Sequence, residues 1–167
     1  MLRVAVVGAG YFGTFHAQRF AAHPGVQLVA IVDTDLAKAS ALAQTYECMA
    51  LSDHRQLIGL VDAAAVVVPT TAHFDVTYDL LCAGLHVLVE KPITFDAYSA
   101  EMLADKARVK GVVLQVGHIE RYSAPFCALA PLVERPRYIE SYRISPWRER
   151  GVDVDVIFDL MIHDIDL

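Results

Sequence analysis

Three titratable side chains have residue types and spacing that suit proton transfer. Lys91 belongs to the tripeptide Glu90-Lys91-Pro92, which directly follows an apolar run. A partly buried lysine beside a carboxylate can hold a hydroxyl group or take part in proton transfer. Asp159 and His163 are four residues apart and would share one face of a helix. A histidine that a carboxylate orients is a good general base, so these residues are candidates for an acid/base pair.

Each candidate also has a simpler interpretation. Taken alone, Lys91 is better explained as a solvated loop lysine, because lysines are seldom buried. Asp159 and His163 also fit a helix cap or a solvated acidic face. Together with Asp164 and Asp166 they have ligand types that suit a metal ion. Nothing in their spacing fixes a coordination geometry, however, and no metal is expected.

A glycine-rich turn near the N-terminus, Gly8-Ala9-Gly10-Tyr11-Phe12-Gly13, has the pattern of a dinucleotide-binding turn. Its first glycine permits the tight turn, its second lets the backbone approach the pyrophosphate, and its third lets the helix lie close to the strand. The N-terminus of the helix that follows offers N–H groups and partial positive charge to the phosphates. The alternative is an ordinary crossover with a glycine-rich turn.

An acid follows this turn at a useful distance. Asp33 lies 33 − 13 = 20 residues after the last glycine, where its carboxylate can accept hydrogen bonds from ribose hydroxyls. The same charge would repel a 2′-phosphate, and neither Thr34 nor Asp35 supplies a cation to neutralise one. We therefore expect NAD rather than NADP.

These residues must be positioned by strands and helices, which the apolar runs and helical periodicities of the sequence predict. Strands are expected at 2–7, 26–32, 48–51, 63–68, 86–89 and 112–116, and helices at 14–22, 35–46, 53–60, 74–83 and 96–110. This alternation indicates an α/β fold with a doubly wound parallel sheet, in which ligands bind at the carboxyl ends of the strands. Residues 1–120 are expected to form a dinucleotide-binding Rossmann domain.

The remaining residues, 121–167, are expected to begin an incomplete α+β domain for substrate binding and dimerisation. The expected elements are a helix at 121–133 that Pro125 and Pro131 interrupt, a strand at 137–144, and a helix at 154–167. One strand and one helix cannot close a core. We expect either a C-terminal truncation or completion of this layer by a partner chain.

Composition excludes several classes of protein. The net charge is −6 with no run of Lys and Arg, so nucleic acid is not an expected partner. The apolar runs are too short to cross a bilayer, and Gly8 interrupts the first run too early for a signal peptide. Cys48, Cys82 and Cys127 are widely spaced and are expected to be free thiols in a reducing compartment. The expected location is the cytoplasm.

With these motifs in view, the chain resembles the glucose-fructose oxidoreductase / inositol dehydrogenase / rhizopine catabolism (Gfo/Idh/MocA) family. The matching segments are the glycine turn, Pro69-Thr70-Thr71-Ala72-His73, residues 83–92 and residues 159–163. Glu-Lys-Pro at this offset from the glycine turn is rather specific. Residues 117–121 are similar to members that oxidise nucleotide-linked amino sugars.

The resemblance implies an NAD-dependent enzyme that transfers a hydride between nicotinamide and a hydroxyl-bearing carbon of a sugar, polyol or nucleotide sugar. By position, Lys91 would bind the reacting hydroxyl, His163 would be the acid/base and Asp159 would orient it. The bond before Pro92 is often cis in such enzymes. The resemblance also implies a homo-oligomer, which the tail strand would form.

The expected cofactor-binding residues combine the glycine turn, the acid and the loops beside the nicotinamide ribose: Gly8, Gly10, Tyr11, Phe12, Gly13, Asp33, Thr34, Val68, Pro69, Thr70, His73, Glu90 and Lys91. Arg121, Trp147 and Arg148 are expected to face the substrate.

Two other functions stay open. One is a non-catalytic dinucleotide-binding sensor or a truncated, inactive relic of such an enzyme. The short length favours it, whereas the retained Lys91, Asp159 and His163 speak against it. The other is a folate, biliverdin or dihydrodipicolinate-type reductase, which the Glu-Lys-Pro and Asp-x-x-x-His motifs disfavour.

Overall fold

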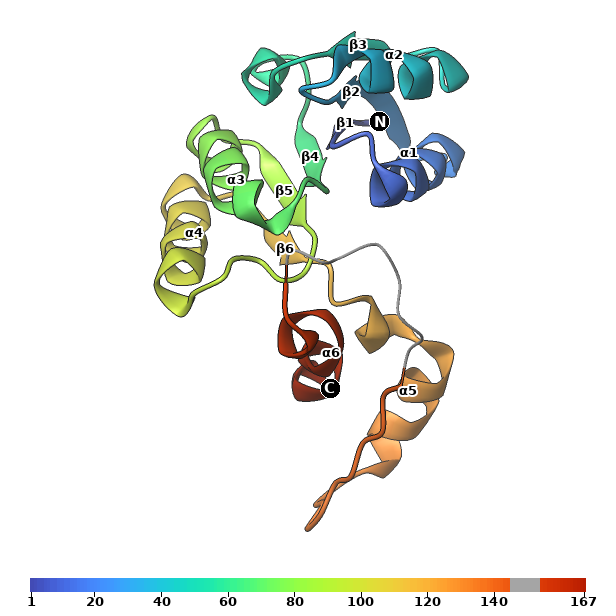
Figure 1. Ribbon diagram of the computed structural model, residues 1–167, viewed down its shortest axis with the longest axis vertical. Coiled ribbons are helices and arrows are strands. Elements are labelled where there is room, and N and C mark those ends of the chain that lie inside the picture. The colour runs from blue at the N-terminus through green and yellow to red at the C-terminus, as the bar shows by residue number, and fades with distance from the viewer. Residues whose placement is uncertain (145–153) are drawn as a thin grey trace. The chain divides into compact units, whose positions relative to one another are not determined.

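A computed structural model of the chain describes residues 1–144 and 154–167. The chain divides into two compact units, Met1–Val116 and Gly117–Leu167 (Figure 1). Among the described residues, no helix is both long enough and apolar enough to cross a membrane.

The first unit contains a parallel sheet of six strands in the order β3-β2-β1-β4-β5-β6. The strands are β1 (Leu2–Val7), β2 (Val26–Val32), β3 (Met49–Leu51), β4 (Ala63–Val66), β5 (His86–Val89) and β6 (Leu114–Val116). The order reverses between β1 and β4, which is where ligands bind in open α/β sheets. The predicted doubly wound sheet is confirmed.

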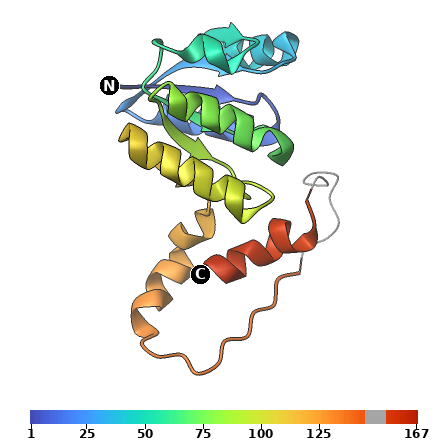
Figure 2. The ribbon, with the colours of Figure 1, turned by 90° about the vertical axis from the view of Figure 1, so that its left-hand side faces the viewer.

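Helices cover both faces of this sheet. They are α1 (Tyr11–Ala22), α2 (Leu36–Thr45), α3 (His73–Cys82) and α4 (Ala97–Lys110). Ala17 of α1 and Ala39 of α2 pack with Val6 in one buried cluster, whereas Leu80 of α3 and Leu103 of α4 belong to the other. Figure 2 shows α3 and α4 side by side on their face. The central strand β1 is therefore buried on both faces, and its residues 4–7 form a continuous apolar run.

The ends of the elements follow local chemistry. The Asp35 carboxylate caps α2 by accepting hydrogen bonds from the amides of Ala37 and Lys38. Strand β4 ends two residues before the predicted end, and a short 3₁₀ turn, Thr70–Ala72, then leads into α3. The helix predicted at 53–60 is only a 3₁₀ turn, His54–Leu57.

The second unit contains α5 (Ala124–Leu129) between 3₁₀ turns at Ile119–Tyr122 and Ala130–Leu132, and a π-helical turn, Ile157–Met161, that continues into α6 (Ile162–Asp166). Pro125 lies in the first turn of α5, where its missing N–H removes no hydrogen bond, so it begins a helix and does not interrupt one.

The strand predicted at 137–144 is wrong for the described structure. These residues join no ladder. A strand exists only when a neighbour completes its hydrogen bonds, and no described residue supplies one here. The polar and apolar pattern of the segment thus lacks the partner that would make it a strand.

Candidate active site

The three glycines of the turn are constrained in different ways. Gly8 has φ +110°, and a Cβ there would lie 2.7 Å from the carbonyl oxygen of Val67. A Cβ at Gly13 would lie 1.9 Å from the carbonyl oxygen of Gly8. A Cβ at Gly10 would meet no atom within 4 Å. Packing within the protein therefore explains Gly8 and Gly13, whereas the space beside Gly10 is open to a ligand.

The turn delivers the chain to the N-terminus of α1. Gly10 is the N-cap residue, no side chain caps the helix, and its first turn carries no acidic residue. The positive end of the helix dipole therefore faces the turn without a negative side chain to offset it. Tyr11 and Phe12 lie in this first turn, are 58% and 43% exposed as residues, and have their rings in edge-to-face contact. This arrangement suits a phosphate group.

The Asp33 carboxylate is fixed at the end of β2. One oxygen accepts a hydrogen bond from the amide of Ala9 at 2.8 Å, and the other accepts one from the amide of Asp35 at 2.9 Å. A carboxylate has about four lone-pair positions, so each oxygen can accept a further hydrogen bond. Thr34 beside it is exposed. The acid and the glycine turn thus form one preassembled group that fits the adenosine ribose and pyrophosphate of a dinucleotide.

Lys91 follows the carboxyl end of β5. The amide of Glu90 donates to the carbonyl of Val66 at 3.0 Å, which keeps this end of β5 beside β4. The bond between Lys91 and Pro92 is cis, as the family resemblance implied. The amide of Lys91 donates to a Glu90 side-chain oxygen at 3.3 Å.

Residue His16 contacts this turn and was missed by the sequence reasoning. Its Nε2 lies 2.8 Å from Glu90 Oε1, and the two side chains are 18% and 16% exposed. His16 is three residues after Gly13, about one helical turn, which was the available signal. Helix α1, which begins at the glycine turn, is therefore in direct contact with the lysine turn.

His73 holds the loops after β4 and β5 together. Its ring is 1% exposed, its Nδ1 lies 2.8 Å from the carbonyl oxygen of Pro92, and its Nε2 lies 2.9 Å from that of Val68. Both ring nitrogens therefore face main-chain carbonyls. Pro69 beside this loop is exposed, and Thr70 is buried. His73 therefore links the loop after β4 to the loop after β5.

Asp159 and His163 belong to the second unit. Asp159 lies in the π-helical turn and His163 in α6, and both are half-buried. The helix predicted at 154–167 is thus not a regular α-helix. Trp147 and Arg148, also expected near the substrate, lie outside the described residues.

The neighbouring carboxylates of α6 have arginine partners. Arg121 donates two hydrogen bonds of 2.6 Å to Asp166, and Arg143 donates to Asp164 at 3.0 Å. These hydrogen bonds hold the pKa values of both carboxyl groups below their usual range. Among the described residues, no group of three or more His, Cys, Asp or Glu side chains could hold a metal ion. Arg121 is therefore engaged within its own unit.

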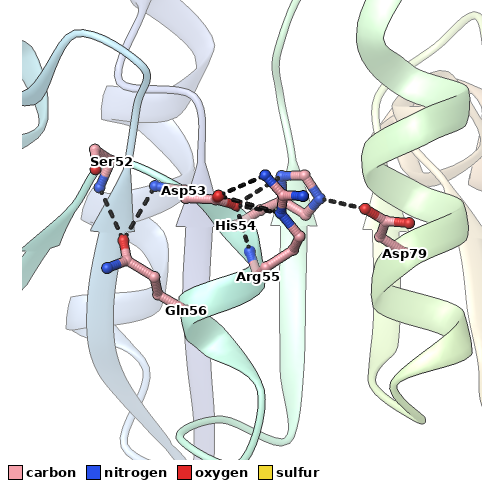
Figure 3. Close-up of polar contacts among 6 residues, drawn as sticks. All are labelled: Ser52, Asp53, His54, Arg55, Gln56 and Asp79. Atoms are coloured by element: carbon pink, nitrogen blue, oxygen red, sulfur yellow. Dashed lines mark hydrogen bonds and ion pairs between the residues drawn. The ribbon is translucent and has the colours of Figure 1, made fainter.

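A second histidine–carboxylate pair, His54 and Asp79, lies in the first unit (Figure 3). His54 Nε2 is 3.0 Å from Asp79 Oδ2, which joins the turn after β3 to α3. In the same turn Arg55 hydrogen-bonds Asp53 and lowers the pKa of this carboxyl group to about 2. Gln56 completes a capping box with Asp53. These contacts stabilise a turn. The His54–Asp79 pair resembles the His16–Glu90 pair in residue types and distance but lies in a turn without Lys91.

Comparison with known proteins identifies relatives along nearly the whole chain. UDP-N-acetylglucosamine 3-dehydrogenase of Acidithiobacillus ferrooxidans is 40% identical over 99% of this chain and 53% of its own length. Inositol 2-dehydrogenase of Arthrobacter sp. (strain FB24) is 34% identical over 99% of this chain and 52% of its own. The chain thus spans about half the length of these curated relatives.

Solved structures agree with this. The structure of UDP-N-acetylglucosamine 3-dehydrogenase from Acidithiobacillus ferrooxidans has a TM-score of 0.93 at 39% identity, covering 99% of this chain and 54% of that one. GenD2 from gentamicin A biosynthesis, solved in complex with NAD, has a TM-score of 0.75 at 33% identity, covering 79% of this chain and 38% of that one.

The family expected from the motifs is confirmed. The model of the oxidoreductase family with an NAD-binding Rossmann fold matches residues 2–118. This chain belongs to the Gfo/Idh/MocA oxidoreductase family.

Proposed function

We propose that the protein is an NAD-dependent dehydrogenase that transfers a hydride between nicotinamide and a hydroxyl-bearing carbon of a sugar, polyol or nucleotide sugar. The observation that carries this proposal is the 2.8 Å contact between His16 of α1 and Glu90 of the lysine turn. It supports one crevice in which the glycine turn binds the cofactor and Lys91 meets the substrate. Residues 1–120 would form the cofactor domain, and residues 121–167 would begin the substrate domain.

The chemistry divides between cofactor and protein. Bound NAD would supply the hydride acceptor. The protein must hold the substrate with its C–H directed at the nicotinamide and remove the hydroxyl proton. Lys91 would hold that hydroxyl, and its positive charge would stabilise the developing alkoxide. His163 would accept the proton, with Asp159 orienting its ring.

We favour NAD over NADP because of Asp33. Its carboxylate is half-buried and held by two amides, so it cannot turn away from a 2′-phosphate. The nearby cation Lys38 lies 3.7 Å from Asp35, which already offsets its charge. Titration with NADH and NADPH by fluorescence should show tighter binding of NADH. Asp33→Ala should weaken NADH binding and reduce the difference between the affinities for NADH and NADPH. Equal affinities for the two in the unchanged protein would contradict the preference for NAD.

For the substrate we propose a nucleotide-linked amino sugar. The 40% identity to UDP-N-acetylglucosamine 3-dehydrogenase supports this class, and so does the similarity of residues 117–121 to such enzymes. The inositol dehydrogenases that match are less similar, at 28–34% identity. A panel of UDP-sugars, free sugars and inositols with NAD, followed by the absorbance of NADH, would rank the classes. Turnover of inositol alone would contradict the proposal.

The role of Lys91 has a direct test. Lys91→Ala should leave NADH affinity within about threefold and lower turnover by about a hundredfold or more, since it removes a charge that acts in the transition state. Lys110→Ala is the control, because Lys110 is an exposed lysine in the last turn of α4. Unchanged turnover in Lys91→Ala would show that another group binds the hydroxyl.

A non-catalytic dinucleotide sensor, or an inactive relic, is the second candidate. The observation that favours it is the glycine turn held beside the Asp33 carboxylate, which would suffice to hold a dinucleotide without Lys91. NAD binding without turnover of any compound in the substrate panel would support it. Turnover that Lys91→Ala abolishes would exclude it.

We also propose that residues 137–144 become a strand when a second chain supplies the neighbouring strand, giving a homo-oligomer. The exposed apolar side chains of Tyr138, Ile139, Tyr142 and Ile144 support this. Light scattering after size exclusion would test it. A monomer at all concentrations would contradict it.

A further inference from the structure

We propose that His16 is a positioning residue that fixes the Glu90-Lys91 turn relative to the cofactor-binding helix. This inference rests on the function proposed above for Lys91. His16 need not touch substrate or cofactor, because it would act through the carboxylate of Glu90.

The geometry of the contact defines the donor. A carboxylate only accepts hydrogen bonds, so the ring of His16 donates from Nε2–H to Glu90 Oε1, at 2.8 Å. Both side chains are more than four-fifths buried, at 18% and 16% exposure. A hydrogen bond to a charged group in such a setting is short and strong. The centroid of the His16 ring also lies 6.1 Å from that of Phe20 on the same helix.

The carboxylate of Glu90 accepts two hydrogen bonds, one on each oxygen. While Oε1 accepts from His16, Oε2 accepts from the backbone amide of Lys91 at 3.3 Å. The rotamer that His16 selects therefore also sets the position of the Lys91 backbone. Without His16, Glu90 could turn toward solvent and release this amide.

The other end of the contact belongs to the helix that begins at the glycine turn. His16 is six residues beyond Gly10, within the first two turns of α1. A helix of this length moves as one rigid piece, so His16 would move together with the glycine turn. The contact thus ties the place where the pyrophosphate is expected to the lysine that is expected to hold the hydroxyl. Small errors in such an alignment slow a reaction strongly: a misplacement of about 1 Å can lower the rate by about a hundredfold.

Two substitutions separate positioning from other roles. Gln places its amide nitrogen close to where histidine has Nε2, so His16→Gln can still donate to Glu90. Asn is shorter and cannot reach. We expect His16→Asn to lower kcat at least about tenfold with NADH affinity within about threefold of the unchanged protein, and His16→Gln to stay within about threefold in both.

His54→Asn is the matched control. It breaks a histidine–carboxylate contact of similar length, 3.0 Å to Asp79, in a turn that does not carry Lys91. Its kcat should stay within about threefold of the unchanged protein. Equal losses in His16→Asn and His54→Asn, or an equal loss in His16→Gln, would overturn the proposal.

A second measurement does not depend on turnover. Hydrogen exchange of the Lys91 amide, followed by NMR, should become at least about tenfold faster in His16→Asn and should be unchanged in His16→Gln and His54→Asn. If the unchanged protein turns over no substrate, the proposed function fails, and the exchange rates still decide whether His16 holds the turn. Unchanged exchange in His16→Asn would overturn the proposal whatever the activity.

Discussion

Replacing Gly10 with alanine should abolish tight dinucleotide binding while leaving the fold intact. The Cβ would meet no protein atom within 4 Å, and the backbone angles of Gly10, φ −81° and ψ −162°, are open to alanine. Alanine restricts the unfolded chain, which stabilises by about 0.4–1 kcal/mol. It is also a poorer N-cap residue than glycine, and that loss is of similar size. The two effects offset, so the free energy of unfolding should change by less than about 1 kcal/mol.

In contrast to its small effect on stability, Gly10→Ala should strongly weaken dinucleotide binding. The added methyl group of Gly10→Ala would occupy the space through which the backbone approaches the pyrophosphate. We expect NADH affinity to fall at least about tenfold, which corresponds to about 1.4 kcal/mol or more. Fluorescence titration with NADH measures the affinity, and urea unfolding without cofactor measures the stability.

Gly13→Ala provides the contrast. A Cβ there would lie 1.9 Å from the Gly8 carbonyl oxygen, which is 3.0 − 1.9 = 1.1 Å inside the distance below which such contacts essentially never occur. This oxygen belongs to the backbone and cannot move aside as a side chain could, so Gly13→Ala should lose stability even without cofactor. If Gly10→Ala bound NADH normally, or unfolded as readily as Gly13→Ala, the assignment of the open space to the pyrophosphate would be wrong.

Two predictions concern stability. His73→Ala would remove the ring that faces the carbonyl oxygens of Pro92 and Val68. A neutral imidazole donates one hydrogen bond, so one of these oxygens loses its donor, and urea unfolding should show a loss of about 1–3 kcal/mol; a loss below about 1 kcal/mol would contradict the contact. The Arg3 side chain, 2.6 Å from Asp62, lowers the pKa of that carboxyl group to about 2, against about 3.9 in an unfolded chain. A depressed folded-state pKa gives stability that is present above about pH 4 and lost as the pH falls through about 2. Asp62→Asn should therefore lower Tm at pH 7 and have a smaller effect at pH 2, and equal shifts at both pH values would contradict this.

The sheet and the glycine turn were predictable because they depend on local patterns. Continuous apolar runs fix the buried parallel strands, and the spacing of Gly8, Gly10 and Gly13 fixes the turn. The carboxylate of Asp35 was recognisable as a cap because a cap acts within three residues of its own position.

The contacts around the lysine turn were not predictable in this way. His16 and Glu90 are 74 residues apart, and only the order of the strands brings them together. His73 was expected beside the ribose, yet its two ring nitrogens face carbonyls of Val68 and Pro92. The failure at 137–144 has a related cause, because a strand depends on a partner that the segment's own pattern does not contain.

The two histidines constrain the lysine turn from opposite faces of the sheet. His16 comes from α1, which packs with Val6, and His73 from α3, which packs on the other face with Val7. One contacts Glu90 before the lysine and the other contacts the carbonyl of Pro92 after it. Lys91 is thus located by the residues on either side of it.

Two constraints on one turn should not act independently. His73→Gln can keep the contact of Nε2 while losing that of Nδ1, so it releases Pro92, and His16→Asn releases Glu90. Once one substitution has made the lysine turn mobile, the second substitution adds less to the displacement of Lys91. The combined loss in kcat should therefore fall short of the product of the single losses, by a coupling of about 0.5–3 kcal/mol. Losses that multiply within about 0.5 kcal/mol would mean that the two histidines act on separate features of the site.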